Sequence, residues 1–295
     1  MRVTATQVYR SQLRQTRTKS AAAFEAQETA ISGRRIRRPS DDPAGAARSV
    51  RIREMRGDIG ASRGKIETIS NELLHQEQAL GSMTDMLSRA RELAVQMANP
   101  TASAAARTSA AVEIEAITSG VIALSNTRVG AKRLFAGSQT GGDAFDPAGT
   151  YLGDSNAISV QAHSTATVQV TLAGDALLRG ASGGPDIIGA LNSLEAALSA
   201  DNLTGIQSSL TDLADSTDWL IQQRSVVGSR MQLAGALDTH LEDLDVNLVQ
   251  EQSQVEDADT IEAYSEVIRT RQAFEAALQV TSAARIQNVF EMLGV

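Results

Sequence analysis

Apolar side chains recur three and four residues apart along most of the chain, which is the spacing of one face of an α-helix. The longest such seam runs from Ile52 to Met97 and has polar positions at Ser62 and Gln76. It predicts a helix over about 44–98, which would span roughly 80 Å at 1.5 Å per residue. Asn99-Pro100 should end this helix, because proline disfavours helical geometry in the residue before it.

Further helical seams follow this proline. Thr101 or Ser103 is suited to cap a second helix, whose seam extends to residue 135. Pro185-Asp186 opens another helix, and a longer one carries apolar residues from Ile206 to Leu248. The seam of the second helix consists of Ile114, Ile117, Val121, Leu124, Ala131 and Phe135. We therefore predict a mainly α fold of long helices packed against one another.

The periodicity changes between Gly137 and Gly184. Glycine clusters and Asp146-Pro147 mark turns there, while residues 158–160 and 167–172 alternate between apolar and polar side chains as half-buried strands do. We predict a small β-rich insertion between the helices.

The two ends of the chain carry thin apolar stripes at helical spacing. At ~25 cal/mol per Å², such stripes bury too little area to offset the entropy of ordering a lone helix. We therefore expect the two terminal helices to pack on each other and on neighbouring subunits. The residues predicted to form this assembly interface are Tyr9, Leu13, Phe24, Ile31, Tyr264, Ile268, Phe274, Leu278, Ile286, Val289 and Leu293.

Charge is distributed unevenly between the two ends. Residues 1–60 hold 13 Lys or Arg against 6 Asp or Glu, so they are net positive in a chain of net charge −8. Nine acidic residues and no Lys or Arg lie between Asp238 and Glu262. Opposite charges should therefore draw the head and the segment before the tail together.

The composition of the chain argues against disulfides, cysteine-based metal sites, a signal peptide and a membrane span. The chain has no cysteine and only 3% aromatic residues, so neither disulfides nor Cys-based metal sites can form. Met1–Gln7 precedes polar and charged residues instead of an apolar core, so we expect no cleaved Sec signal peptide. No apolar run approaches the ~18 residues of a membrane span, and no membrane partner is predicted.

Pro39-Ser40-Asp41-Asp42-Pro43 places two carboxylates side by side, which in an enzyme could serve as acid and base or hold a metal. A helix start explains these residues better. Asp42 is a favoured N-cap residue, Pro43 has the φ suited to the first helical position, and Ser40 or Asp41 can accept hydrogen bonds from free backbone donors. We predict a helix-capping turn.

Other motif-like stretches lack the residues that their chemistry needs. Residues 60–66 have three residues between glycines where a phosphate-binding loop needs four, and residues 243–247 lack the glycine of a calcium loop. The arginine run 34–38 lacks interleaved aromatics, so we prefer salt bridges to nucleic acid. The histidines occur singly, at His75, His163 and His240. We predict no catalytic residues, no metal, no cofactor and no enzymatic activity.

Residues 31–46, Ile-Ser-Gly-Arg-Arg-Ile-Arg-Arg-Pro-Ser-Asp-Asp-Pro-Ala-Gly-Ala, lie between two helical segments and resemble a turn of the flagellin superfamily. Pro39 and Pro43 make the turn most similar to the branch that joins the hook of the bacterial flagellum to the filament. Further similar stretches follow in the family's order, at residues 133–140, 151–154 and 256–259.

The resemblance implies an elongated, antiparallel bundle of long helices. Residues 1–44 and 256–295 would form a terminal coiled coil that lines an inner tube. Residues 45–135 and 186–255 would form an α-helical rod domain, and residues 136–185 an exposed β-rich domain.

The function implied by the resemblance is structural. Subunits would connect another hook-associated protein to flagellin and template filament growth, in a ring or tubular layer of copies, with a cytoplasmic export chaperone as a further partner. The location would be the extracellular flagellum, reached by type III export. Two alternatives remain open: a short flagellin that forms the filament itself, and an enzyme hosted by residues 136–185.

Overall fold

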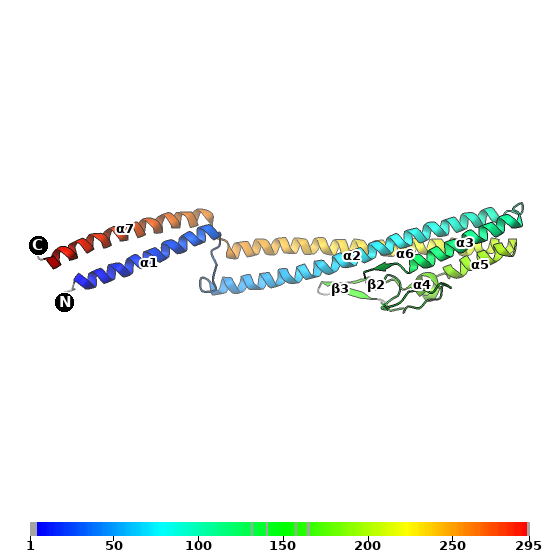
Figure 1. The fold of residues 1–295 in the computed structure, drawn as a ribbon, viewed down its shortest axis with the longest axis horizontal. Coiled ribbons are helices and arrows are strands. Elements are labelled where there is room, and N and C mark those ends of the chain that lie inside the picture. Colours follow the sequence, from blue (N-terminus) through cyan, green and yellow to red (C-terminus); the bar gives the residue numbers. More distant parts are fainter. Residues whose placement is uncertain (1–4, 131, 140, 157, 164–165, 294–295) are drawn as a thin grey trace. The chain divides into compact units, whose positions relative to one another are not determined.

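A computed structural model describes the backbone of residues 5–130, 132–139, 141–156, 158–163 and 166–293 (Figure 1). Side chains at 5–6, 162–163, 166, 182 and 284–293 lie outside the described part. The elements are, in order, α1 (Ala5–Ser32), α2 (Pro43–Met97), α3 (Ala104–Ser125), β1 (Arg128–Val129), β2 (Lys132–Arg133), β3 (Ser159–His163), β4 (Ala166–Gln169), α4 (Gly174–Leu178), the 3-10 turn η1 (Ala181–Gly183), α5 (Ile187–Ser199), α6 (Leu203–Glu256) and α7 (Thr260–Leu293). The predicted mainly α fold with a small β insertion is confirmed.

The chain divides into two compact units. The terminal unit comprises Met1–Asp58 and Leu244–Val295, and the central unit comprises Ile59–Asp243. Two long helices, α2 and α6, each contribute to both units.

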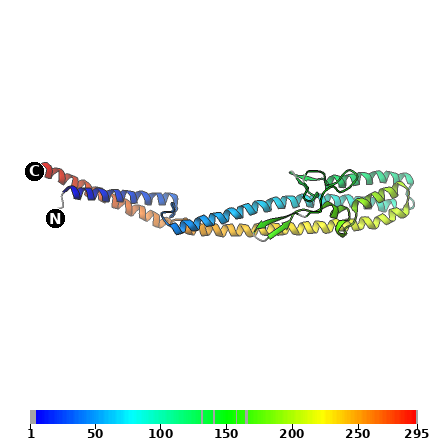
Figure 2. The same ribbon diagram turned by 90° about the horizontal axis from the view of Figure 1, so that it is seen from below.

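In the terminal unit, α1 packs along α7, with the start of α1 and the end of α7 at the same end of the pair (Figures 1 and 2). The hydroxyls of Thr16 and Thr281 lie 2.8 Å apart across this pair. Ala26 and Ala263 are both buried, so small side chains allow the two helices to approach closely. A small separate core joins α2 to the end of α6 through Ile36, Ile52 and Val255.

The central unit holds the main hydrophobic core. Helix α3 packs against α5, and the long seam of α2 lines the same cluster. Met55, which the spacing placed in this seam, is 45% exposed, whereas Ile52 and Ile59 on either side are buried. Fully buried seam residues are Leu73, Leu80, Met83, Leu87, Ala90 and Ala94.

Helix α3 ends ten residues earlier than predicted. It stops at Ser125, and the chain turns back through a short hairpin of β1 and β2, with Gly130 at φ +62°. The side chain of Asn126 donates to the Phe145 carbonyl at 2.8 Å and accepts from its amide at 2.9 Å. This partner lies outside the helix, so helical spacing could not reveal it. Phe135 is buried but not helical, and Ala131 lies outside the described residues.

The β region covers one side of the central core. β3 and β4 form an antiparallel pair near the predicted strand segments, and Val168 and Val170 are buried. Gln76 interrupts the apolar seam of α2 because its side-chain amide donates to the Val170 carbonyl at 2.7 Å. Gln76 therefore joins α2 to the β region by a hydrogen bond.

Helix α3 is long and apolar enough to cross a membrane by length and composition, which our sequence prediction did not anticipate. Several of its apolar side chains, among them Ile114 and Val121, are buried in the central core, whereas Val112 is exposed. Core packing therefore accounts for the apolar residues on its buried face.

Replacing Gly137 with alanine should destabilise the central unit. Gly137 has φ +70°, and a Cβ there would lie 2.0 Å from the carbonyl oxygen of Asp154. We expect Gly137→Ala to lower the free energy of unfolding by about 2 kcal/mol. Urea denaturation followed by Trp219 fluorescence measures this. The control Gly141→Ala, which meets nothing within 4 Å, should be nearly neutral, and an equal loss in both variants would contradict the explanation.

Candidate assembly surface

The turn between α1 and α2 carries the two adjacent aspartates. Asp42 accepts from the Gly45 amide at 2.9 Å, and α2 begins at Pro43. Asp41 instead accepts from the amides of Arg37 at 3.1 Å and Arg38 at 2.8 Å, so it closes the loop before the helix. These backbone donors lower the pKa of both carboxyl groups.

The first and last thirds of the chain meet in a backbone contact beside this turn. The Arg35 amide donates to the Glu256 carbonyl at 2.7 Å, and the Ala258 amide donates to the Gly33 carbonyl at 2.9 Å. Gly33 has φ +66°, a backbone conformation that glycine adopts at little cost. We call residues 33–36 and 256–258, with the side chains of Ser49 and Arg53, the head–tail clasp.

Glu256 occupies the centre of the head–tail clasp and is only 3% exposed. It accepts from the Ser49 hydroxyl, from Arg53 Nη2 at 2.7 Å and from Gln252 Nε2 at 3.3 Å. Burial by itself would raise the pKa of Glu256, but these hydrogen bonds and the Arg53 charge outweigh it and lower the pKa from 4.5 to about 2. The carboxylate is therefore held ionised inside the clasp.

Acidification should weaken the head–tail clasp. Because the folded pKa of Glu256 is about 2 and its ordinary value is 4.5, its stabilising contribution is complete above pH 4.5 and is lost as the pH falls towards 2. This contribution is at most about 3 kcal/mol. Thermal unfolding followed by circular dichroism, from about pH 5 downward, tests it. Glu256→Gln should show a shallower decline, and identical pH profiles would argue against this role.

Salt bridges continue from the head–tail clasp along α2 and α6. In the terminal unit, Arg48 pairs with Glu251 at 2.7 Å and Arg56 with Asp245 at 2.7 Å. Of the arginine run that we expected to meet the acidic segment, Arg34 does so, at 3.8 Å from Glu256. Arg35 and Arg37 pair locally, with Asp42 and Glu28. The arginines of α2 make most of the contacts to the acidic segment.

The predicted interface residues of the terminal helices are largely exposed. Phe24 is 64% exposed and Ile31 78%, and Tyr264, Ile268 and Leu278 are exposed as well. Further residues, Tyr9, Leu13 and Phe274, are half-buried. The side chains of Ile286, Val289 and Leu293 lie outside the described residues.

The sequence prediction missed further exposed apolar residues on the same helices. Ile261 is 79% exposed, and Val8 and Val280 are exposed too. Ile261 precedes Ile268 by seven residues, so the heptad spacing could have identified it. Large apolar side chains left in contact with water along one helix pair mark a surface for association.

The His, Asp and Glu side chains are the groups of this chain that could bind a metal ion. Within the described part of the chain, no three His, Asp or Glu side chains are grouped closely enough to hold a metal ion. The predicted lack of catalysis stays a prediction.

Comparison with known proteins gives these helices a context. Residues 4–140 match the bacterial flagellin N-terminal helical region, and residues 210–293 match the bacterial flagellin C-terminal helical region. The chain belongs to the flagellin family. The two matches contain all of α1, most of α6 and all of α7, so the exposed terminal pair is part of the family's shared helical regions.

Within the flagellin family, the chain is 22% identical to flagellar hook-associated protein 3 of Escherichia coli over 99% of each protein. It is 41% identical to the flagellar filament 41 kDa core protein of Borreliella burgdorferi, over 34% of this chain and 30% of that one. The crystal structure of Bacillus cereus FlgL superposes with a TM-score of 0.62 at 24% identity, covering 69% of this chain and 99% of that one. The last similarity shows a shared fold.

Proposed function

We propose that the protein is a structural subunit of the bacterial flagellum at the hook–filament junction, where it connects another hook-associated protein to flagellin and templates filament growth. The observation that carries this proposal is the exposed apolar surface of the α1–α7 pair, which a lone subunit leaves in water. The full-length similarity to a hook-associated protein supports the junction over other places in the flagellum.

The proposal assigns a role to each region. Residues 1–44 and 256–295 line an inner tube, residues 45–135 and 186–255 form the rod, and residues 136–185 are exposed. Copies of the chain associate in a ring or tubular layer. The exposed apolar side chains of α1 and α7 become buried there, which provides the free energy that the thin stripes lack in one chain.

Export precedes assembly in this proposal. The chain passes through the flagellar type III channel without a cleaved signal peptide, and a cytoplasmic chaperone covers the C-terminal helix until then. Thin apolar stripes suit a segment that folds only on binding, because the cost of ordering it is met at the moment of association.

Immunogold labelling of intact flagella tests the junction role. We expect one labelled band between hook and filament, and cells without the protein should carry bare hooks and release flagellin into the medium. Label along the whole filament would overturn the junction proposal.

A short flagellin is the second candidate. The specific observation in its favour is the 41% identity to a filament core protein over 100 residues. That similarity covers about a third of the chain, whereas the similarity to hook-associated protein 3 covers nearly all of it. Label along the filament, and filaments that form from the purified protein alone, would favour this candidate.

A further inference from the structure

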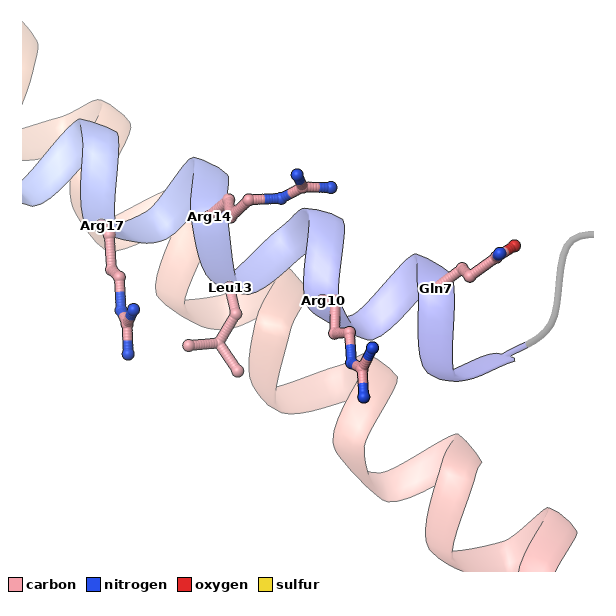
Figure 3. A pocket seen from close by; sticks show the side chains of 5 residues that line it. All are labelled: Gln7, Arg10, Leu13, Arg14 and Arg17. Atoms are coloured by element: carbon pink, nitrogen blue, oxygen red, sulfur yellow. The ribbon is translucent and has the colours of Figure 1, made fainter.

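Two arginines of α1 have no ion-pair partner among the described residues. Arg10 and Arg17 are exposed and lie on either side of the half-buried Leu13. Figure 3 shows these three side chains pointing to one side of α1, while the side chain of Arg14 points away from them. Arg14 and Gln7 line the same open hollow as these three residues. The spacing i, i+3, i+7 places them on one helical face. We call Arg10, Leu13 and Arg17 the arginine stripe.

The same pattern occurs on α2, and there it has a partner. Arg56, Ile59 and Arg63 have the spacing of the arginine stripe. In the terminal unit, Arg56 Nε lies 2.7 Å from Asp245 Oδ1. In the central unit, Arg63 Nε lies 2.9 Å from Asp238 Oδ1. Ile59, between the two arginines, is 5% exposed.

The α6 residues that pair with these α2 residues have the same spacing and the opposite charges. On α6, Asp238 and Asp245 stand seven residues apart with Leu241, which is 1% exposed, between them. The higher-numbered arginine meets the lower-numbered aspartate, so the two helices run antiparallel. On each helix a buried apolar residue thus lies between two ion-paired side chains, an arrangement that fixes direction and register.

We propose that the arginine stripe binds an acidic helix of another protein, antiparallel to α1, with two carboxylates seven residues apart around an apolar residue. Leu13 packs on the apolar residue, and Arg10 and Arg17 each pair with one carboxylate. Exposed ion pairs add little affinity but select the partner and its direction. The inference rests on the proposed assembly role, since it identifies one contact of the terminal helices.

A second copy of the chain does not supply this partner. Among the described helices, the acidic pattern of α6 is already bound to α2. The other occurrence, Asp259–Ala263–Glu266, is also engaged. The Asp259 carboxylate accepts from the Ile261 amide at 2.8 Å, Ala263 is buried, and Glu266 pairs with Arg269. The arginine stripe therefore requires a helix from a different chain.

Peptide binding to the full-length protein tests the arginine stripe. The probe is a dye-labelled synthetic helix of about 20 residues, with glutamates seven residues apart around a leucine. A second peptide has the same composition with the glutamates on the opposite face. Fluorescence anisotropy should show that only the first binds, more weakly as salt rises.

Charge reversal gives the matched comparison. Arg10→Glu with Arg17→Glu should weaken binding about tenfold. Lys19→Glu should leave binding unchanged, because exposed Lys19 lies nine residues from Arg10 and therefore on the opposite face of α1. A peptide with lysines in place of the two glutamates should bind the double variant and not the natural chain. Circular dichroism and Trp219 fluorescence check that each variant is folded.

Equal binding of the two acidic peptides, an equal loss with Lys19→Glu, or absence of binding would each overturn the proposal. Failure of the lysine peptide to bind the folded double variant would overturn it too. Labelling of flagella tests the assembly role independently, so the arginine stripe and the junction role can fail separately.

Discussion

Deleting residues 264–295 should abolish incorporation into the flagellum and leave the central unit folded. The deletion removes most of α7 and exposed apolar residues such as Ile268 and Leu278, which we expect to be buried between subunits. None of the deleted residues belongs to Ile59–Asp243. Phe274→Asp should also prevent incorporation, because it places a charge at a half-buried position of the same helix.

Two measurements test the expected effects of this deletion. Electron microscopy and immunogold labelling report incorporation, and Trp219 reports the central unit. Trp219 is the single tryptophan of the chain, and its indole N–H donates to the Leu177 carbonyl at 3.2 Å inside that unit. Unchanged Trp219 emission and an unchanged urea midpoint are expected. Loss of cooperative unfolding in the truncated chain would contradict the independence of the two units.

The second large effect is expected from Glu256→Ala, which should destabilise the terminal unit by about 3 kcal/mol. The substitution empties a buried position and leaves the buried Ser49 hydroxyl without its carboxylate partner. Arg53 also loses its ion pair. Hydrogen–deuterium exchange in peptides covering 43–58 and 244–256 should rise, while exchange in the core of the central unit should not.

Glu251→Ala is the matched control for this clasp variant. Glu251 also pairs with an arginine of α2, but the Glu251 side chain is 37% exposed, whereas that of Glu256 is 4% exposed. Removal of an exposed pair should cost no more than about 0.5 kcal/mol. If the two variants accelerated exchange equally, the head–tail clasp would contribute no more than an ordinary surface pair.

The long helices could be predicted from sequence because their signal is local. The seam of α2 repeats over many turns, and Asn99-Pro100 marks its end by backbone chemistry alone. The thin apolar stripes of the terminal helices are also local, and Phe24, Ile31 and Ile268 in them are exposed; their role in an assembly interface stays a prediction. The capping aspartate Asp42 stands where its short side chain can reach the amides of the next turn.

Other features depended on partners far away in the chain. Helix α3 stops at Ser125 because Asn126 bonds to the backbone of Phe145, nineteen residues on, and helical spacing carries no trace of that contact. Gln76 interrupts the apolar seam of α2 because its side chain donates a hydrogen bond to the Val170 carbonyl. Both features result from hydrogen bonds to residues far away in the sequence, and these bonds interrupt the helical spacing of apolar residues.

The sequence by itself determined the helices, the β insertion, the charge difference between the ends and the thin terminal stripes, because each of these features depends on residues that are close together in the sequence. Only the tertiary structure decided that Glu256 is buried, since the Ser49 hydroxyl and the Arg53 guanidinium that hold its charge are more than 200 residues away. It likewise distinguished the paired arginines of α2 from Arg10 and Arg17 of α1, which have no ion-pair partner within the part of the chain that the structure describes. Identical local spacing leads to different outcomes because an ion pair needs its partner within a few ångströms.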